Sequence, residues 1–263
     1  MRAQERKVLE RFYSSAQVRE LDRRAIAGGI AGHALMQRAA AAAWRELLRR
    51  WPKARRISVL CGPGNNGGDG YELARLALAA GLDVELFQVG AAPKSGDAAA
   101  ARKAWLAGGG QARDYAGEAP GGEVIVDGIF GIGLARAPEG AAQAAILAIN
   151  AAHGRGAGVL ALDVPSGLDA DRGAAPGDAV RADLTVGFIG AKAGLHTAEG
   201  PDFAGEVVVD SLDVPDSVYR GVDGCAEALR PDMLAALLPR RARTAHKGDM
   251  GHVLLVGGEQ GMA

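Results

Sequence analysis

Short apolar runs alternate with longer amphipathic segments along most of the chain. Four runs that end in glycine or polar residues predict buried strands, at residues 57–60, 84–87, 124–127 and 158–163. Apolar residues at helical spacing between them predict helices at residues 69–80, 97–107 and 139–151. Strands that alternate with helices form right-handed β-α-β units. We therefore expect an α/β protein with a mainly parallel sheet covered on both faces, a three-layer αβα fold of the Rossmann-like type.

Two helices are predicted before the first of these strands. Ser14 or Ser15 is the expected N-cap of the first helix, which ends at Gly28-Gly29. The second helix spans residues 33–51 and is closed by a proline. After the alternating region, residues 182–188 and 206–209 predict two more strands with little helix between them.

The C-terminal part of the chain departs from this alternation. Residues 221–227 have the composition of a linker, residues 231–238 predict a short helix, and residues 251–263 predict a buried strand that runs into a glycine-rich turn. The helix that such a turn should begin is missing. Because a single strand and turn bury too little surface to fold alone, we expect the chain to be the N-terminal part of a longer protein.

Composition narrows the classes of partner. The 263 residues include 30 Lys and Arg and 31 Asp and Glu, a net charge of −1, so no global field attracts nucleic acid or an anionic membrane. Cys61 and Cys225 form no CxxC pair, which disfavours a disulfide framework and a zinc site. The sequence shows neither a signal-like N-terminus nor an apolar run of membrane-spanning length. We expect a soluble, cytoplasmic protein.

Glycine accounts for 39 of the 263 residues, about twice its ordinary share, and it gathers where apolar runs end. Three polar and glycine-rich clusters follow predicted strands, at residues 61–70, 127–134 and 163–169. In an open parallel sheet, ligands bind beyond the carboxyl ends of the strands. We therefore expect the three clusters to form one site.

The first cluster has the composition of an anion-binding loop. Backbone N–H groups of successive glycines can point at a phosphate, and the helix predicted to begin near Asp69 adds its positive end. The cluster lacks the lysine of a Walker loop and the GxGxxG spacing, so it indicates a nucleotide or pyrophosphate loop of another kind. A simple tight turn is the alternative reading. The adjacent amides of Asn65 and Asn66 favour a binding role, because a turn needs neither.

Two carboxylates, Asp127 and Asp163, follow predicted strands. Each one alone could cap a helix or accept from a turn amide. Together, beside Asn66 and Ser166, they favour a cation of low charge, and potassium fits one or two carboxylates better than magnesium does. Ser166 is not in a GxSxG motif, which disfavours a hydrolase. Lys192 is expected either to reach the same crevice and bind phosphate or to be a solvated lysine.

These motifs resemble a known family. Gly62-Pro63-Gly64-Asn65-Asn66-Gly67-Gly68-Asp69-Gly70, Val126-Asp127-Gly128-Ile129-Phe130-Gly131-Ile132-Gly133-Leu134, Asp163-Val164-Pro165-Ser166-Gly167-Leu168-Asp169 and Ala182-Asp183-Leu184-Thr185-Val186 together resemble the NAD(P)HX epimerase domain, also called the YjeF N-terminal domain, over residues 12–219. Residues 246–258 resemble the opening of an ADP-dependent NAD(P)HX dehydratase domain, which is ribokinase-like. The resemblance implies an epimerase domain at residues 1–220, a linker at 221–245 and a short, incomplete dehydratase segment at 246–263.

The resemblance also implies a function in nicotinamide nucleotide repair. The family interconverts the R and S forms of hydrated NADH and NADPH, and a dehydratase, a lyase, then restores the cofactor. Because nearly all of that domain is absent, we expect no dehydratase activity from this chain. The substrate is a small molecule, and whether the chain forms a homo-oligomer stays open.

Site residues carry over by motif. The residues implied to bind the substrate are Asn65, Asn66, Gly67, Gly68, Asp69, Gly131, Ile132, Gly133, Leu134, Ala135, Arg136, Ala137 and Asp163. Those implied to bind potassium are Asn66, Asp127 and Ser166. Epimerisation next to a ring nitrogen needs an acid for hydroxide to leave and a base for water to return. Our hypothesis assigns this catalytic role to Asp163, with Lys192 as a helper.

Three other functions compete with this interpretation. A non-catalytic nucleotide-binding or scaffold module has no chemical reason to retain Asn66, Asp127, Asp163 and Ser166 together. A lipid or sugar kinase would show a magnesium-binding acidic cluster. A Rossmann dehydrogenase would show an acidic residue at the end of the second strand, where this chain has residues 87–90, Phe-Gln-Val-Gly.

Overall fold

The computed structural model describes residues 11–134, 136–229, 233–234 and 243–244. The chain divides into two units, Met1–Ala228 and Leu229–Ala263. All the helices and strands named below belong to the first unit. The helix predicted at residues 231–238 lies largely outside the described residues, and the strand predicted at 251–263 lies wholly outside them.

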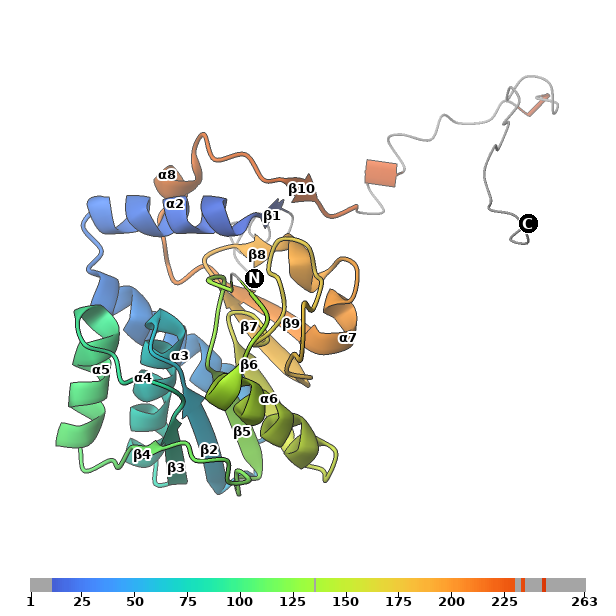
Figure 1. Cartoon of the computed structure of the whole chain (residues 1–263). Helices are drawn as coiled ribbons and strands as arrows, with labels where there is room; N and C mark the ends of the chain where they lie inside the picture. Colours follow the sequence, from blue (N-terminus) through green and yellow to red (C-terminus); the bar gives the residue numbers. More distant parts are fainter. Residues whose placement is uncertain (1–10, 135, 230–232, 235–242, 245–263) are drawn as a thin grey trace, which may run out of the picture. The chain divides into compact units, whose positions relative to one another are not determined.

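The first unit is built on a seven-stranded sheet whose neighbouring strands are all parallel, in the order β4-β3-β2-β5-β6-β7-β9 (Figure 1). The strands are β2 (Arg56–Cys61), β3 (Asp83–Gln88), β4 (Arg113–Asp114), β5 (Val124–Gly128), β6 (Gly158–Leu162), β7 (Leu184–Phe188) and β9 (Glu206–Asp210). The prediction of a parallel α/β sheet is confirmed. The two-residue strand β4 was not predicted.

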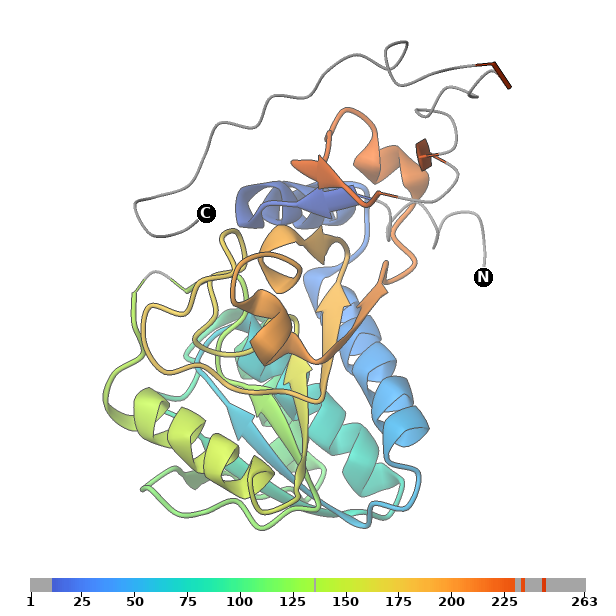
Figure 2. The same ribbon diagram turned by 90° about the vertical axis from the view of Figure 1, so that its right-hand side faces the viewer.

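Helices cover both faces of this sheet (Figures 1 and 2). One face packs against α3 (Gly32–Arg50), α4 (Asn65–Ala79) and α5 (Gly96–Ala107), and the other against α6 (Gly140–His153). Adjacent strand residues alternate between the two cores: Val59 joins the first and Leu60 the second, and both are fully buried. This period of two in a continuously apolar run is what a sheet covered on both faces requires.

A second, short sheet in the order β10-β1-β8 was not predicted. It joins β1 (Arg11–Tyr13), β8 (Ala191–Lys192) and β10 (Ala226–Glu227), three segments far apart in the sequence. The first unit also contains short helices at Ala193–Leu195 (η1), Gly200–Ala204 (α7) and Asp216–Tyr219 (α8). Strand β10 falls within the segment that we predicted as a linker. The domain boundaries themselves stay a prediction.

The first predicted helix is α2 (Ser15–Ala27), and the sequence located its ends well. Ser14 is the N-cap: its hydroxyl accepts from the N–H of Gln17, and the Gln17 side chain accepts from the N–H of Ser14. This reciprocal pair satisfies two backbone donors that the helix start leaves free. Gly28 follows the helix as its C-cap.

Helix α4 begins at Asn65, four residues before the predicted start at Asp69. The two glycines of its first turn suggested a loop, because glycine is a poor helix former. Close packing explains them instead. A Cβ on Gly67 would lie 1.9 Å from the carbonyl oxygen of Gly62, and a Cβ on Gly62 would lie 2.0 Å from that of Ile129.

Strand order reverses between β2 and β5. Strand β2 pairs with β3 on one side and with β5 on the other, and β6, β7 and β9 follow outward from β5. The connections from β2 and from β5 therefore leave in opposite directions, which opens a crevice at the carboxyl ends of these two strands. The N–H of Gly62 donates to the carbonyl of Gly128 at 3.0 Å and ties the two loops together.

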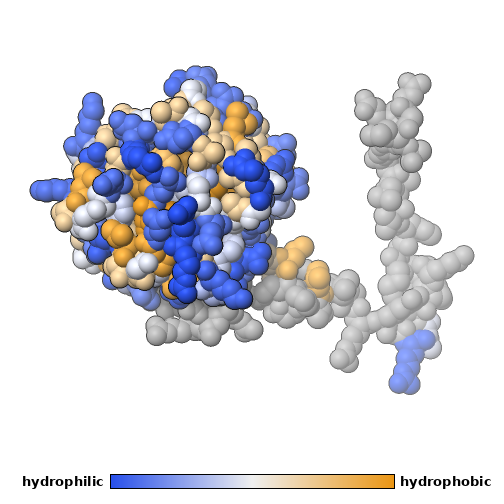
Figure 3. Space-filling model, turned by 90° about the horizontal axis from the view of Figure 1, so that it is seen from below, coloured by the Kyte–Doolittle hydropathy of each residue, from blue (hydrophilic) through white to orange (hydrophobic). Residues whose placement is uncertain are grey.

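The surface mixes polar and apolar residues. Seen from below, hydrophilic residues dominate the coloured face of the chain, with apolar areas interspersed among them (Figure 3). Among the described residues, no helix combines the length and apolar character that crossing a bilayer requires.

Candidate active site

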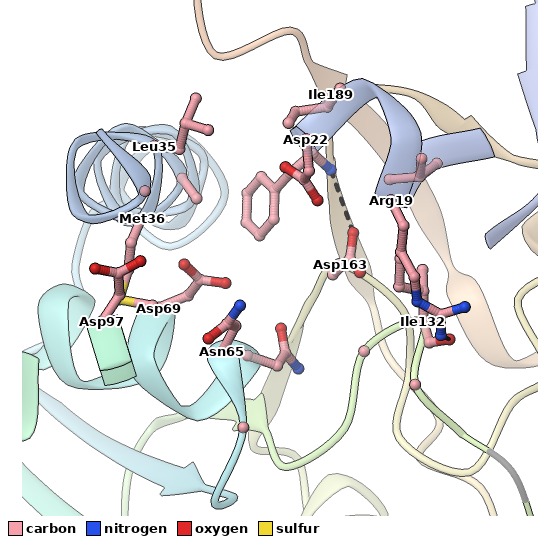
Figure 4. A pocket seen from close by; sticks show the side chains of 18 of the residues that line it. Arg19, Asp22, Leu35, Met36, Asn65, Asp69, Asp97, Ile132, Asp163 and Ile189 are labelled. Atoms are coloured by element: carbon pink, nitrogen blue, oxygen red, sulfur yellow. Dashed lines mark hydrogen bonds between the residues drawn. The ribbon is translucent and has the colours of Figure 1, made fainter. Parts of the chain in front are cut away.

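A cavity of about 570 Å³ lies at the carboxyl ends of β2, β5 and β6 (Figure 4). The loops after these strands, residues 63–66, 129–133 and 163, form what we call the loop wall. Helix α2, through residues 18–26, and the start of α3, residues 32–39, form what we call the helix wall. The cavity therefore occupies the crevice predicted from strand order.

Seven residues that the sequence assigned to the substrate line this cavity, namely Asn65, Asn66, Asp69, Gly131, Ile132, Gly133 and Asp163. Gly67 and Gly68 do not line it. They serve packing instead, since a Cβ on Gly68 would lie 2.4 Å from the methyl group of Met36. Leu134, Arg136 and Ala137 are not among the described lining residues, and Ala135 lies outside the described part of the chain.

The three residues assigned to potassium form a connected cluster that runs from Asn66 in the loop wall to Asp127 and Ser166 behind it. The Asn66 amide Nδ2 donates to the Phe130 carbonyl at 2.9 Å, and the Phe130 N–H donates to the Ser166 hydroxyl at 2.8 Å. The Ser166 hydroxyl donates to Asp127 Oδ1 at 2.6 Å, and its N–H donates to Oδ2 at 2.8 Å. Asp127 and Ser166 are buried. The structure thus brings together residues from the loops of three strands.

This cluster fits a cation of low charge. The Asn66 Oδ1 atom is buried and accepts no hydrogen bond from any described residue, although a buried amide oxygen normally has a partner. Burial raises the pKa of Asp127 to about 6, although hydrogen bonds from Ser166 and Ile129 lower it. In the described part of the chain, no group of three or more His, Cys, Asp or Glu residues is arranged to bind a metal. Amide, hydroxyl and single-carboxylate oxygens are ligands that suit a monovalent ion.

Asp163 has a different partner from Asp127. The Lys192 Nζ donates to Asp163 Oδ1 at 2.5 Å and to the Phe188 carbonyl at 2.7 Å. Lys192 is fully buried, so neither a solvated lysine nor an open phosphate ligand describes it. The other oxygen, Asp163 Oδ2, lies beside Gly131 at the cavity. Asp163 therefore has one oxygen held by a counterion and one beside a glycine that lines the cavity.

Backbone strain gathers around the cavity. Asp163, Ile189 and Leu212 line it, and all three have positive φ angles, 64°, 66° and 56°. Such left-handed conformations cost of order 1–3 kcal/mol each for residues other than glycine and tend to occur at functional sites. The N–H of Asp163 donates to the Val186 carbonyl at 2.8 Å, which helps to hold the strained residue at the strand end.

The sequence prediction did not assign the polar residues of the helix wall to the site, although Asp22 belongs to the helix pair that resembles the start of the family. Arg19 and Asp22 both line the cavity, and the Arg19 guanidinium donates to the Ile132 carbonyl at 3.0 Å. Burial raises the pKa of Asp22 to about 6, with Lys192 lowering it and Asp163 raising it. The sequence did contain a signal for Asp22. Asp22 lies one turn after Val18 and one turn before Ile26, so it is an acid on the apolar face of a helix.

Acidic residues outnumber basic ones among the described residues that line the cavity. Of the described residues that line it, four are aspartates, Asp22, Asp69, Asp97 and Asp163, and one, Arg19, is a cation. Asp69 is 9% exposed, and burial is the first reason why its pKa lies well above its usual range, with nearby Asp163 and Asp22 adding to the shift. Carboxyl groups in such surroundings can exist as neutral acids near neutral pH, which suits proton transfer.

Comparison with known proteins places these features in context. Residues 32–194 match the family described as YjeF-related protein N-terminus. The bifunctional NAD(P)H-hydrate repair enzyme of Coxiella burnetii is 45% identical over 253 residues, which are 95% of this chain and 51% of that protein. The enzyme of the same description from Escherichia coli is 40% identical, over 89% of this chain and 45% of its own length. The chain thus spans about half the length of these two relatives.

A shorter relative and a solved structure cover the chain differently. The NAD(P)H-hydrate epimerase of Limosilactobacillus fermentum is 40% identical over 211 residues, 76% of this chain and 96% of that protein. The crystal structure of the yeast protein ynu0 aligns with a TM-score of 0.69 and 19% identity, over 80% of this chain and 93% of the yeast chain. That likeness supports the fold alone.

Proposed function

The chain belongs to the family of YjeF-related protein N-termini, and from this premise we propose that it is an NAD(P)H-hydrate epimerase. It interconverts the R and S forms of hydrated NADH or NADPH. The observation that carries the proposal is Asp163, which lines the cavity with its Oδ2 beside Gly131 while Lys192 holds its Oδ1. The L. fermentum relative, named as an epimerase, is almost fully covered by this chain.

The reaction requires a hydroxyl group to leave a ring carbon next to nitrogen and to return on the other face. A proton must reach the departing oxygen, so that it leaves as water while the nitrogen lone pair forms a C=N bond. A second water then adds to this cation and releases a proton. Asp163 Oδ2 is placed to exchange these protons, and the aspartates around the cavity favour the cationic intermediate over the neutral substrate.

The walls also suit a dinucleotide. The N-terminus of α4, at Asn65, points its free N–H groups toward the cavity and favours an anion such as a pyrophosphate. Arg19 offers the matching positive charge from the helix wall. Apolar side chains of both helices, such as Val18 of α2 and Leu35 of α3, can cover a ring and exclude water.

Potassium is the proposed bound ion. Asn66, through its unpartnered Oδ1, would hold it together with Asp127 and Ser166. When bound, the ion supplies a positive charge that stabilises the loop wall and offsets part of the negative charge of the site. The ligands themselves have a structural task, because they join the loops after β2, β5 and β6.

The test supplies purified R-form hydrate to the chain and follows the S form with a separate S-specific dehydratase, which regenerates NADH absorbance. We expect recovery faster than the uncatalysed rate, and faster in potassium than in a large organic cation. Asp163→Asn should lower kcat by about 10²–10⁴-fold, because Asn tolerates the left-handed backbone but cannot carry the proton.

Asp178→Asn is the matched control, since Asp178 is half-buried, is not among the residues lining the cavity and accepts a hydrogen bond from Gln143. It should leave the rate unchanged. Recovery at the uncatalysed rate with the unaltered chain would contradict the proposed function. A rate that is equal in both cations would contradict only the role of potassium.

A further inference from the structure

Epimerisation needs proton transfer on two faces of one ring, and Asp163 serves only one wall of the cavity. On the face that it does not reach, another group must protonate the departing hydroxyl or accept the proton of the returning water. Among the other carboxylates near Asp163, Asp127 is buried and bonded to Ser166. Asp69 also lines the cavity, but it is buried. The inference that follows rests on the proposed function.

The helix wall contributes a second carboxylate to the cavity that Asp163 lines. Asp22 extends from α2 into the cavity, and Asp163 approaches from the end of β6 (Figure 4). Asp22 lies close enough to the buried Lys192–Asp163 pair to interact electrostatically with both partners. The two carboxyl groups therefore reach one cavity from different elements.

Contacts along α2 hold Asp22 in place. The helix start is fixed by its capping box and by the N–H of Ser15, which donates to Asp171 Oδ1 at 2.5 Å. Near its end, the Arg24 guanidinium donates to the Arg220 carbonyl at 2.7 Å. A residue in the middle of a helix that is anchored at both ends has a well-defined position, as proton transfer requires.

The side chain of Asp22 is free to act on a ligand. Within the described part of the chain it accepts no hydrogen bond, unlike Asp163 and Asp127. The charged and titratable groups near it are Arg19 on its own helix, Asp163, Lys192, Asp69, and Tyr219 of α8. Burial raises the pKa of Asp22 to about 6, so both its neutral acid and its carboxylate are populated near neutral pH.

We propose that Asp22 is the second proton-transfer residue of the epimerisation and acts on the ring face opposite to Asp163. In one direction, Asp22 gives its proton to the hydroxyl on its own face, the C–O bond breaks, and water leaves as the nitrogen forms the C=N bond. A water on the other face then forms a new C–O bond and gives a proton to Asp163 Oδ2. In the reverse direction the two residues exchange roles, and solvent returns the proton between turnovers.

Asp22→Asn tests this assignment, with Asp22→Glu as the conservative variant and Glu20→Gln as the control. Glu20 is on the same helix, pairs with Arg23 and Arg24, and is not among the lining residues. We expect Asp22→Asn to lower kcat by about 10²–10⁴-fold with KM changed less than about threefold. The limb of the kcat profile near pH 6 should disappear. Asp22→Glu should recover part of the rate, and Glu20→Gln should keep all of it.

Oxygen exchange provides a readout that a structural role would not change. In water enriched in ¹⁸O, the unaltered chain should label the hydroxyl of both forms as they interconvert. Asp22→Asn should still label the form whose hydroxyl faces Asp163, because Asp163 alone can release and return water on its own face, but that form should not invert.

Inversion at the original rate in Asp22→Asn would overturn the assignment. So would loss of labelling in both forms together with a raised KM, which would indicate a structural role. An unaltered chain that does not epimerise would contradict the proposed function itself, so the two failures are distinguishable.

Discussion

The two walls of the cavity are built in opposite ways. Polar groups of the loop wall and of the segments directly behind it are mostly held by other polar groups: Asp127 by Ser166, Asp163 by Lys192, and Gly62 by the backbone of Gly128. On the helix wall, Asp22 has no hydrogen-bond partner among the described residues, and Arg19 makes one exposed bond. The loop wall therefore stabilises the fold as well as binding a ligand. The polar groups of the helix wall serve the reaction instead, and their burial lowers the stability of the folded chain.

The largest expected effect is at the loop wall, where Gly62→Ala places a Cβ about 2.0 Å from the Ile129 carbonyl oxygen. Both partners in this contact are backbone segments, so neither can move aside as a flexible side chain could. We expect a loss of more than about 4 kcal/mol in the free energy of unfolding, measured by denaturant titration. Gly64→Ala is the control, because a Cβ there meets nothing within 4 Å and should change stability little. Equal losses in the two variants would contradict the close-approach argument.

Lys192→Met should cause the next largest loss in the free energy of unfolding. It removes the ammonium from a buried ion pair and leaves Asp163 with an unmatched charge, so we expect a loss of about 3 kcal/mol in unfolding free energy. The double variant with Asp163→Asn should be more stable than Lys192→Met alone, since neither charge remains. A double-mutant cycle of denaturant titrations measures this coupling. Simple additivity of the two losses would show that the pair is not coupled.

Asp22→Asn at the helix wall should raise the free energy of unfolding, whereas the two substitutions above lower it. The pKa of Asp22 is about 6 in the folded protein and about 4 in the unfolded chain. The contribution of this carboxyl group to stability is therefore complete below pH 4 and is lost as the pH rises through 6. Asn stays neutral. The variant should therefore gain stability relative to the unaltered chain between pH 4 and pH 7, by at most about 3 kcal/mol. A stability difference that does not change with pH over this range would contradict the burial of Asp22.

Arg19→Ala should change stability least, because the Arg19 side chain is exposed and makes one hydrogen bond to Ile132. The substitution should weaken substrate binding instead. Loss of a charge-assisted contact with a pyrophosphate should raise KM by about tenfold or more. Arg23→Ala is the control on the same helix, since Arg23 pairs with Glu20 in an exposed ion pair. The two variants should differ in KM and agree in unfolding free energy.

The sequence predicted which loops form the site, but it did not predict the side-chain contacts within the site. It located the clusters after β2, β5 and β6, because glycine and polar residues at strand ends are a local signal. It left Lys192 in solvent, on a phosphate or as a helper of Asp163, whereas the structure buries Lys192 in an ion pair with Asp163. That pairing joins residues 29 positions apart through two strands, and no periodic pattern reports it.

By itself the sequence determined the alternation of strands and helices, the parallel sheet and the capping of α2, since each depends on the spacing of apolar residues or on the chemistry of one short segment. Only the tertiary structure decided that α4 begins at Asn65, that β1, β8 and β10 pair, and that Asp22 and Asp163 line one cavity. These features depend on how closely two distant backbones approach and on which groups are buried together. Such contacts arise when the whole core packs, so local propensity cannot specify them.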